Sequence, residues 1–318
     1  MFVDLSGFTR LTEKLMQQGA EGAEDLSYIL NHIFQPTVTL VYEQGGLIPY
    51  FAGDSFTAIF PISDEPLAAN APVTAAATIL QTAQATVQRF LRDQEDADSL
   101  LAEHQIGIKI GLSAGLVEWG VVGNRRKGFY FRGQPIESSA QAQTYASSLE
   151  VVSDADFLTA TRNLALPATP LHNGYFRLDL VTIPPAKPNG NTIKLPLPDA
   201  KIIADFLPEE AFAEGNAGEF RNVVSVFLSF SGVGTHEALD HFASVVLDQS
   251  LNFGGYFKEI DFGDKGGVMC CLFGAPVSFE NNTERALEFI AAVQEELLHL
   301  ETLTGARYRI GISSGVAF

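Results

Sequence analysis

The chain has 318 residues, of which 46% are hydrophobic and 18% charged, and its formal net charge is −18. This length and composition predict two globular domains of ordinary size rather than a disordered or fibrous chain. The negative charge excludes nucleic acid and anionic membrane surfaces as general partners. No apolar run reaches the length of a membrane span, so we expect a cytoplasmic protein. The adjacent Cys270 and Cys271 imply no disulfide framework, because neighbours in a strand point to opposite faces.

Strand and helix patterns alternate along the first half of the chain. Apolar residues recur at helical spacing between Leu26 and Val41, and Gly45-Gly46 ends that pattern as glycine ends helices. Alternating residues that turn at Gly53-Asp54 predict a β-hairpin. The expected elements, in chain order, are a buried strand at 1–5, a helix at 26–41, a hairpin at 47–60, an alanine-rich helix at 67–91 and a core strand at 106–115.

Three segments recur in the same order later in the chain. Phe2-Val-Asp-Leu-Ser-Gly7 matches Phe227-Leu-Ser-Phe-Ser-Gly232, Gly45-Gly46 matches Gly254-Gly255, and Ile108-Lys-Ile-Gly-Leu-Ser-Ala-Gly115 matches Tyr308-Arg-Ile-Gly-Ile-Ser-Ser-Gly315. Repetition in order predicts duplication of one α+β domain. We expect a first domain at 1–183, a proline-rich connector at 184–218 that packs along the domains, and a second, incomplete copy at 219–318.

Two carboxylates and a helix start are the main candidates for chemistry. Asp4 ends the first strand and Asp54 lies in the hairpin turn, so both would project from one edge of a shared sheet. Such a pair can hold Mg²⁺, and two ions can activate an attacking oxygen and stabilise a leaving one. The free N–H groups of the segment that enters the helix suit a polyphosphate; this segment is Leu5, Ser6, Gly7, Phe8 and Thr9. Alternatively, Asp4 caps the helix and Asp54 is a plain turn residue.

The combination of Phe2-Val-Asp-Leu-Ser-Gly-Phe-Thr9 with Phe51-Ala-Gly-Asp-Ser55 resembles the signature of class III nucleotidyl cyclase domains. The duplication is similar to the tandem catalytic domains of bicarbonate-responsive soluble adenylyl cyclases and their bacterial relatives. The resemblance implies two ferredoxin-like domains with a βαββαβ core that pair within one chain, with the ATP site between them. It also implies that Asp4 and Asp54 are the catalytic, metal-binding aspartates for two Mg²⁺ or Mn²⁺ ions, and that the product is cyclic AMP.

The second copy departs from the first. Ser229 stands where the first copy has Asp4, so this copy lacks the same metal pair, and Asp264 is expected at the turn position. Lys258 matches the lysine that adenylyl cyclases of this type direct at adenine. A lysine donor suits N1 of adenine, an acceptor, and would meet the N1–H donor of guanine. The alternative for Lys258 is a solvated strand residue.

The first copy departs from the family pattern at two positions of a later helix. Glu137 and Gln141 stand where the family carries an Asn and an Arg that support the ribose and the transition state. We therefore expect those two residues, and further domains, beyond Phe318, and expect this fragment alone to be inactive. Tyr50 and Ala140 replace the two cations that bind bicarbonate, so we expect no bicarbonate control.

Two other functions remain open. One is a cyclase-like regulatory module that binds nucleotide without catalysis, and the other is a guanylyl cyclase. The cluster Arg125-Arg126-Lys127 is expected to be a solvated hairpin turn.

Overall fold

The computed structural model describes residues 1–62, 71–81, 107–180, 183, 199–208, 220–263, 266–304 and 306–317. These residues form two compact units: unit 1 is Met1–Val117 with Gly133–Leu195, and unit 2 is Glu118–Arg132 with Pro196–Phe318. The segment 118–132, which lies inside the first domain expected from the sequence, thus packs with unit 2. No helix in the described part of the chain is long and apolar enough to cross a membrane.

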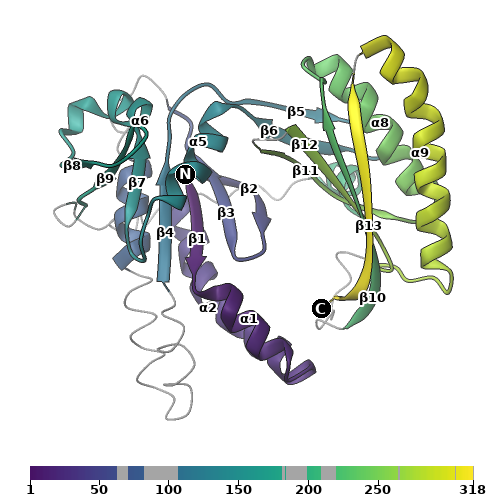
Figure 1. The fold of residues 1–318 in the computed structure, drawn as a ribbon, viewed down its shortest axis with the longest axis horizontal. Helices are drawn as coiled ribbons and strands as arrows, with labels where there is room; N and C mark the ends of the chain where they lie inside the picture. The colour runs from purple at the N-terminus through teal and green to yellow at the C-terminus, as the bar shows by residue number, and fades with distance from the viewer. Residues whose placement is uncertain are drawn as a thin grey trace. The chain divides into compact units, whose positions relative to one another are not determined.

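Unit 1 is built on one seven-stranded sheet (Figure 1). All neighbouring strands are antiparallel except β4 and β7, which are parallel. The strands in spatial order are β2 (Leu47–Ala52), β3 (Ser55–Ile59), β1 (Phe2–Ser6), β4 (Gly107–Leu112), β7 (Val151–Asp154), β9 (Tyr175–Leu178) and β8 (Ala168–Pro170).

Helices cover this sheet and bury its apolar side chains. The central strands contribute Val3, Phe56 and Ile110, each at most 1% exposed, to a core shared with the helices. The helices are α1 (Phe8–Met16), α2 (Ala20–Glu43), a helical segment at 71–81, α5 (Gln134–Thr144), α6 (Ala155–Ala160) and the short η1 (Arg162–Leu164). Of the alanine-rich helix expected at 67–91, residues 71–81 are helical, and 67–70 and 82–91 lie outside the described residues.

Unit 2 repeats the strand order of the first four strands of unit 1. Its sheet runs β11 (Tyr256–Gly263), β12 (Gly266–Phe273), β10 (Arg221–Ser231) and β13 (Arg307–Ala317), all antiparallel. Its helices are α7 (Ala200–Phe206), α8 (His236–Asn252) and α9 (Asn282–Thr304). The order β2-β3-β1-β4 in one unit and β11-β12-β10-β13 in the other confirms the predicted α+β fold with a βαββαβ core in each.

Equivalent helices of the two units also end in the same way. Gly45 and Gly254 both have positive φ, +78° and +70°. The next glycine then donates its N–H back across the last turn, from Gly46 to Val41 at 2.9 Å and from Gly255 to Ser250 at 2.7 Å. This is the Schellman closure, in which a left-handed glycine stops the helix.

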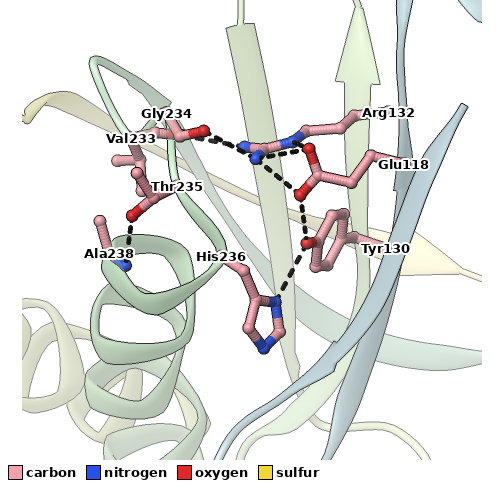
Figure 2. Close-up of polar contacts among 8 residues, drawn as sticks. All are labelled: Glu118, Tyr130, Arg132, Val233, Gly234, Thr235, His236 and Ala238. Carbon is pink, nitrogen blue, oxygen red and sulfur yellow. Dashed lines mark hydrogen bonds and ion pairs between the residues drawn. The ribbon is translucent and has the colours of Figure 1, made fainter. Parts of the chain in front are cut away.

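The hairpin of β5 (Glu118–Val122) and β6 (Gly128–Arg132) is held in unit 2 by a charged network at its open end (Figure 2). The Arg132 guanidinium donates to both carboxylate oxygens of Glu118, with an Nη2–Oε1 distance of 2.8 Å. It also donates to the carbonyl oxygens of Val233 and Gly234, in the loop before α8, at 3.0 and 2.8 Å. Paired charge-assisted bonds of this kind fix geometry as well as adding energy.

Tyr130 connects this ion pair to α8. Its ring is 1% exposed, and its hydroxyl donates to Glu118 Oε1 at 2.8 Å and lies 3.1 Å from Nδ1 of His236. A phenol has one proton, and the carboxylate can only accept. His236 must therefore carry its own proton on Nδ1 and donate it to the phenol oxygen.

The tip of the hairpin is exposed at Arg125, as expected from the sequence, and half-buried at Arg126 and Lys127. Arg125 donates to Oδ1 of Asn252 at 2.7 Å, and Arg126 donates to the carbonyl oxygen of Ala204 at 3.0 Å. These contacts tie the tip to α8 and α7. The short α7 is the described part of the expected connector, which otherwise lies almost wholly outside the described residues.

We predict that Glu118→Gln loosens the hairpin. The hydrogen bond from Tyr130 is the largest cause that lowers the pKa of Glu118. Burial opposes it, and the hydrogen bonds and the charge of Arg132 lower the pKa further. A half-exposed ion pair contributes about 0.5–1 kcal/mol, so hairpin amides should exchange about two- to fivefold faster in the variant at pH 7.

The same interaction should make the hairpin sensitive to acid. Because the folded pKa of Glu118 lies below the ordinary value of about 4.3, its contribution is present above that pH and lost as pH falls further. Amide protection in the wild type should therefore decline as the pH falls below about 4.3, and Glu118→Gln should remove this decline. Equal exchange rates in both proteins would contradict the prediction.

A second prediction concerns two equivalent glycines. An added Cβ at Gly111 in β4 would lie 1.8 Å from the Ser139 carbonyl oxygen of α5, whereas one at Gly311 in β13 meets no atom of the described residues within 4 Å. Gly111→Ala should lower the free energy of unfolding by about 1–3 kcal/mol or more, and Gly311→Ala should change it by less than about 0.5 kcal/mol. Urea denaturation followed by circular dichroism measures both, and equal effects would refute the packing argument.

Candidate functional site

The centre of unit 1 brings the two predicted aspartates together. Asp4 lies on β1, opposite Ser55 of β3 on one side and Lys109 of β4 on the other. The backbone N–H of Leu5 donates to the carbonyl oxygen of Asp54 at 3.0 Å, which joins the β2–β3 turn to the end of β1. Strand pairing thus places both carboxylates at the same edge of the sheet.

The two carboxylates are close enough to repel each other. Burial, and then the negative charge of Asp54, raises the pKa of Asp4 to about 6, while Lys109 acts in the opposite direction. Gln143 on α5, which is 8% exposed, donates from Nε2 to Oδ2 of Asp4 at 2.5 Å. Within the described residues, the Asp54 carboxylate accepts no hydrogen bond. The pair therefore has a deficit of positive charge that a cation would fill.

The donor set fits a hard divalent cation that also binds other ligands. Within the described ranges there is no group of three or more His, Cys, Asp or Glu side chains that could enclose a metal. Mg²⁺ does not require such a cage, because it is usually held by one or two carboxylates together with water and substrate phosphates. Asp4 and Asp54 are the residues that would hold it.

The start of α1 lies directly beyond β1 and is open. Gly7 is the N-cap residue, with φ of +78°, and no side chain caps the helix. Asp4 is therefore not a helix cap, and that alternative is wrong. The first turn contains no acidic residue, so the N–H groups that a helix leaves unpaired at its N-terminus face no carboxylate there. Leu5 and Phe8 are buried, whereas Thr9 is exposed and Ser6 is half-buried.

Unit 2 carries different residues at the matching positions. Ser229 lies on β10, opposite Val268 of β12 and Arg309 of β13, as Asp4 lies opposite Ser55 and Lys109. This register agrees with the sequence alignment of Ser229 with Asp4. Asp264, expected at the turn position, lies outside the described residues.

Lys258 occupies an irregular point of β11. The pairing of β11 with β12 shifts register between Phe257 and Glu259, so Lys258 lies in a bulge. Its side chain is 42% exposed, and its Nζ lies 2.7 Å from Oε1 of Glu259. Bulges redirect side chains and are over-represented near active sites. Lys258 belongs to unit 2, whereas the aspartate pair belongs to unit 1.

Sequence reasoning missed two residues that contact the aspartate pair. Lys109 is the one charged residue of an otherwise apolar and glycine strand, a pattern that could have identified it. Gln143 gave no such signal, because residue type and spacing do not distinguish it from the other polar residues of α5. Gln141 instead donates to Thr144 at 3.2 Å, so only the tertiary packing of α5 on β4 distinguishes Gln143.

Comparison with known proteins places this arrangement in a family. Residues 1–158 match the family described as adenylate and guanylate cyclase catalytic domain. Adenylate cyclase type 10 of Oryctolagus cuniculus is 25% identical over 369 aligned positions, which cover the whole chain and 22% of that protein. The protein of the same name from Mus musculus is 30% identical over 155 positions, or 48% of this chain and 9% of the relative. The chain thus spans about a fifth of the length of the first relative.

Among solved structures, a class III adenylyl cyclase-like ATP-binding protein from Pseudomonas aeruginosa aligns with 99% of this chain and 74% of its own. The TM-score is 0.55 at 12% sequence identity, so the likeness concerns the fold of the whole chain. Strand order, helix ends and sequence motif agree with these matches. The first 158 residues of the chain therefore belong to the adenylate and guanylate cyclase catalytic domain family.

Proposed function

We propose that the protein is an adenylyl cyclase that converts ATP to 3′,5′-cyclic AMP and pyrophosphate. The observation that carries the proposal is the pair Asp4 and Asp54 beside the uncapped start of α1, within a domain of this family. Two half-buried carboxylates that repel each other favour a bound cation, and an uncapped helix start favours phosphate.

Each residue has a definite task in the proposed reaction. The ribose 3′-oxygen attacks the α-phosphorus, its proton is released, and the bond to pyrophosphate breaks. Asp4 and Asp54 would hold two Mg²⁺ or Mn²⁺ ions, which when bound neutralise the phosphates and lower the pKa of the 3′-hydroxyl. The N–H groups of Phe8 and Thr9 bind phosphate oxygens, and Gly7 lets the backbone approach them closely.

Two further residues support the carboxylates. Gln143 orients Asp4 through its hydrogen bond to Oδ2, so that the other oxygen can face the cation. Lys109 limits the negative charge of the pair when no cation is bound. Base selection is assigned to Lys258 of unit 2, whose ammonium can donate to N1 of adenine but not accept from N1–H of guanine. Pairing of the two units within one chain would complete the site.

We predict that Asp54→Asn in the full-length protein lowers both Mn²⁺ binding in the presence of ATP and cyclic AMP formation by about 100-fold or more, because one of two metal ligands loses its charge. Electron paramagnetic resonance of Mn²⁺ and chromatography of the products measure these quantities. Asp156→Asn, at an exposed position of α6, is the matched control and should leave both unchanged. Full activity of Asp54→Asn would refute the metal assignment.

We predict that Lys258→Met raises the KM for ATP about tenfold or more, because a charged hydrogen bond to the base is lost. The KM or inhibition constant for GTP should not rise. Lys201→Met, at an exposed position of α7, serves as the control. Cyclic GMP formation that exceeds cyclic AMP formation in the wild type would instead identify a guanylyl cyclase.

A regulatory module that binds nucleotide without catalysis is the second candidate. Glu137, Gln141 and Ser229 occupy positions where the family pattern has other residues, which favours this candidate. The Pseudomonas aeruginosa structure is likewise that of a cyclase-like ATP-binding protein. In the full-length protein, saturable Mn²⁺–ATP binding with no cyclic nucleotide product from ATP or GTP would select the regulatory module.

A further inference from the structure

Unit 2 contains a cavity of about 400 Å³ whose lining residues do not include Lys258. Small-molecule sites have volumes of about 300–1,000 Å³ and are mainly apolar with a few polar groups. The cavity has this composition. Its lining residues come from the hairpin tip, the end of α8, the start of β11 and the 275–279 loop, and include Arg126, Ser250, Leu251, Tyr256, Val277 and Phe279.

Glycines keep this cavity open. A Cβ on Gly254, whose φ is +70°, would lie 2.8 Å from the ring of Phe279, and one on Gly255 would lie 2.7 Å from the ring of Phe273. The ring of Phe279 forms part of the cavity wall, and the Arg285 guanidinium lies 4.0 Å from its centroid. This cation–π contact opposes a movement of the ring into the cavity.

The polar groups of the cavity are incompletely satisfied. The guanidinium of Arg126 has five N–H donors, and its hydrogen bond among the described residues is the one to Ala204. Ser250 is 1% exposed, and its hydroxyl has no nitrogen or oxygen partner in the described part of the chain. It lies within reach of the Cys271 thiol, which is a weak partner. The hydroxyl oxygen of Ser250 is itself buried, so Arg126 is the polar group that remains for a ligand.

Among the described residues that line the cavity, Arg126 is the charged one, although the chain is strongly acidic. Burial raises the pKa of Tyr256, the positive charge of Lys258 and then that of Arg126 oppose this rise, and the negative charge of Glu259 reinforces it. Lys258 is already paired with Glu259, whereas Arg126 has no ion pair among the described residues. Arg126 is thus the group that an anion entering the cavity would meet.

We propose that this cavity binds a small monocarboxylate with an apolar body of about ten to fifteen non-hydrogen atoms. A planar carboxylate matches the fork of one guanidinium, and a single arginine balances a single negative charge. Leu251, Val277 and Phe279 contact the apolar body. A nucleotide polyphosphate does not fit, because its several charges would face one cation.

Binding there would act on the hairpin. Arg126 belongs to the inserted segment 118–132, and the other walls belong to α8, β11 and the 275–279 loop. A ligand that contacts both would tighten the hairpin on unit 2, since any ligand stabilises the state that binds it. The site does not depend on the proposed cyclase function.

The test uses 2-naphthoate as the probe, titrated by calorimetry and by its own fluorescence. We expect saturable 1:1 binding that Arg126→Gln weakens at least tenfold. Arg125→Gln is the matched control, because Arg125 lies in the same turn, binds Asn252 and does not line the cavity. Neutral 2-naphthamide should bind at least tenfold more weakly, and decanoate tests whether an alkyl body replaces the rings.

A second variant fills the space without altering the hairpin. Val277→Trp should abolish binding of 2-naphthoate while urea denaturation shows that unit 2 remains folded. Asp54→Asn should bind the probe as the wild type does, which separates this proposal from the cyclase proposal. No saturable binding, equal binding by 2-naphthamide, or full binding by Arg126→Gln or Val277→Trp would each overturn the assignment.

Discussion

The position of β1 between β3 and β4 is the constraint on which the candidate site depends. This register places Asp4 opposite Ser55 and Lys109, and it brings the turn at Asp54 within hydrogen-bond distance of Leu5. A shift by one residue would turn Asp4 to the other face of the sheet and expose Val3. The buried apolar residues of β1 therefore fix the geometry of the carboxylates.

The same constraint operates in unit 2 with different chemistry. Ser229 occupies the register position of Asp4, and Arg309 that of Lys109, so the fold is kept while the carboxylate is lost. The strand pairing and the glycines that end the helices do not require a particular polar side chain at the position of Asp4 and Ser229. One scaffold thus carries a pair of carboxylates in unit 1 and different side chains in unit 2.

The hairpin 118–132 changes how the two units are connected. The chain leaves unit 1 after Val117, packs within unit 2, and returns at Gly133 to begin α5. Gln143 of α5 contacts Asp4, so the hairpin lies in sequence between two parts of the same candidate site. Its anchorage by Glu118, Tyr130 and Arg132 costs little desolvation, because the ion pair is partly exposed.

The sequence by itself determined the strands at 1–5, 47–60 and 106–115, the repeat, and the proximity of Asp4 to Asp54, because strand periodicity and turn chemistry are local and the repeated order reveals the shared topology. Only the tertiary structure decided that 118–132 packs with unit 2, that Gln143 rather than Gln141 contacts Asp4, and that Arg126 lines a cavity. These outcomes depend on side-chain packing between segments far apart in the chain. Residue type and spacing do not identify the two partners of such a contact, because many pairs of apolar or polar side chains could pack together equally well.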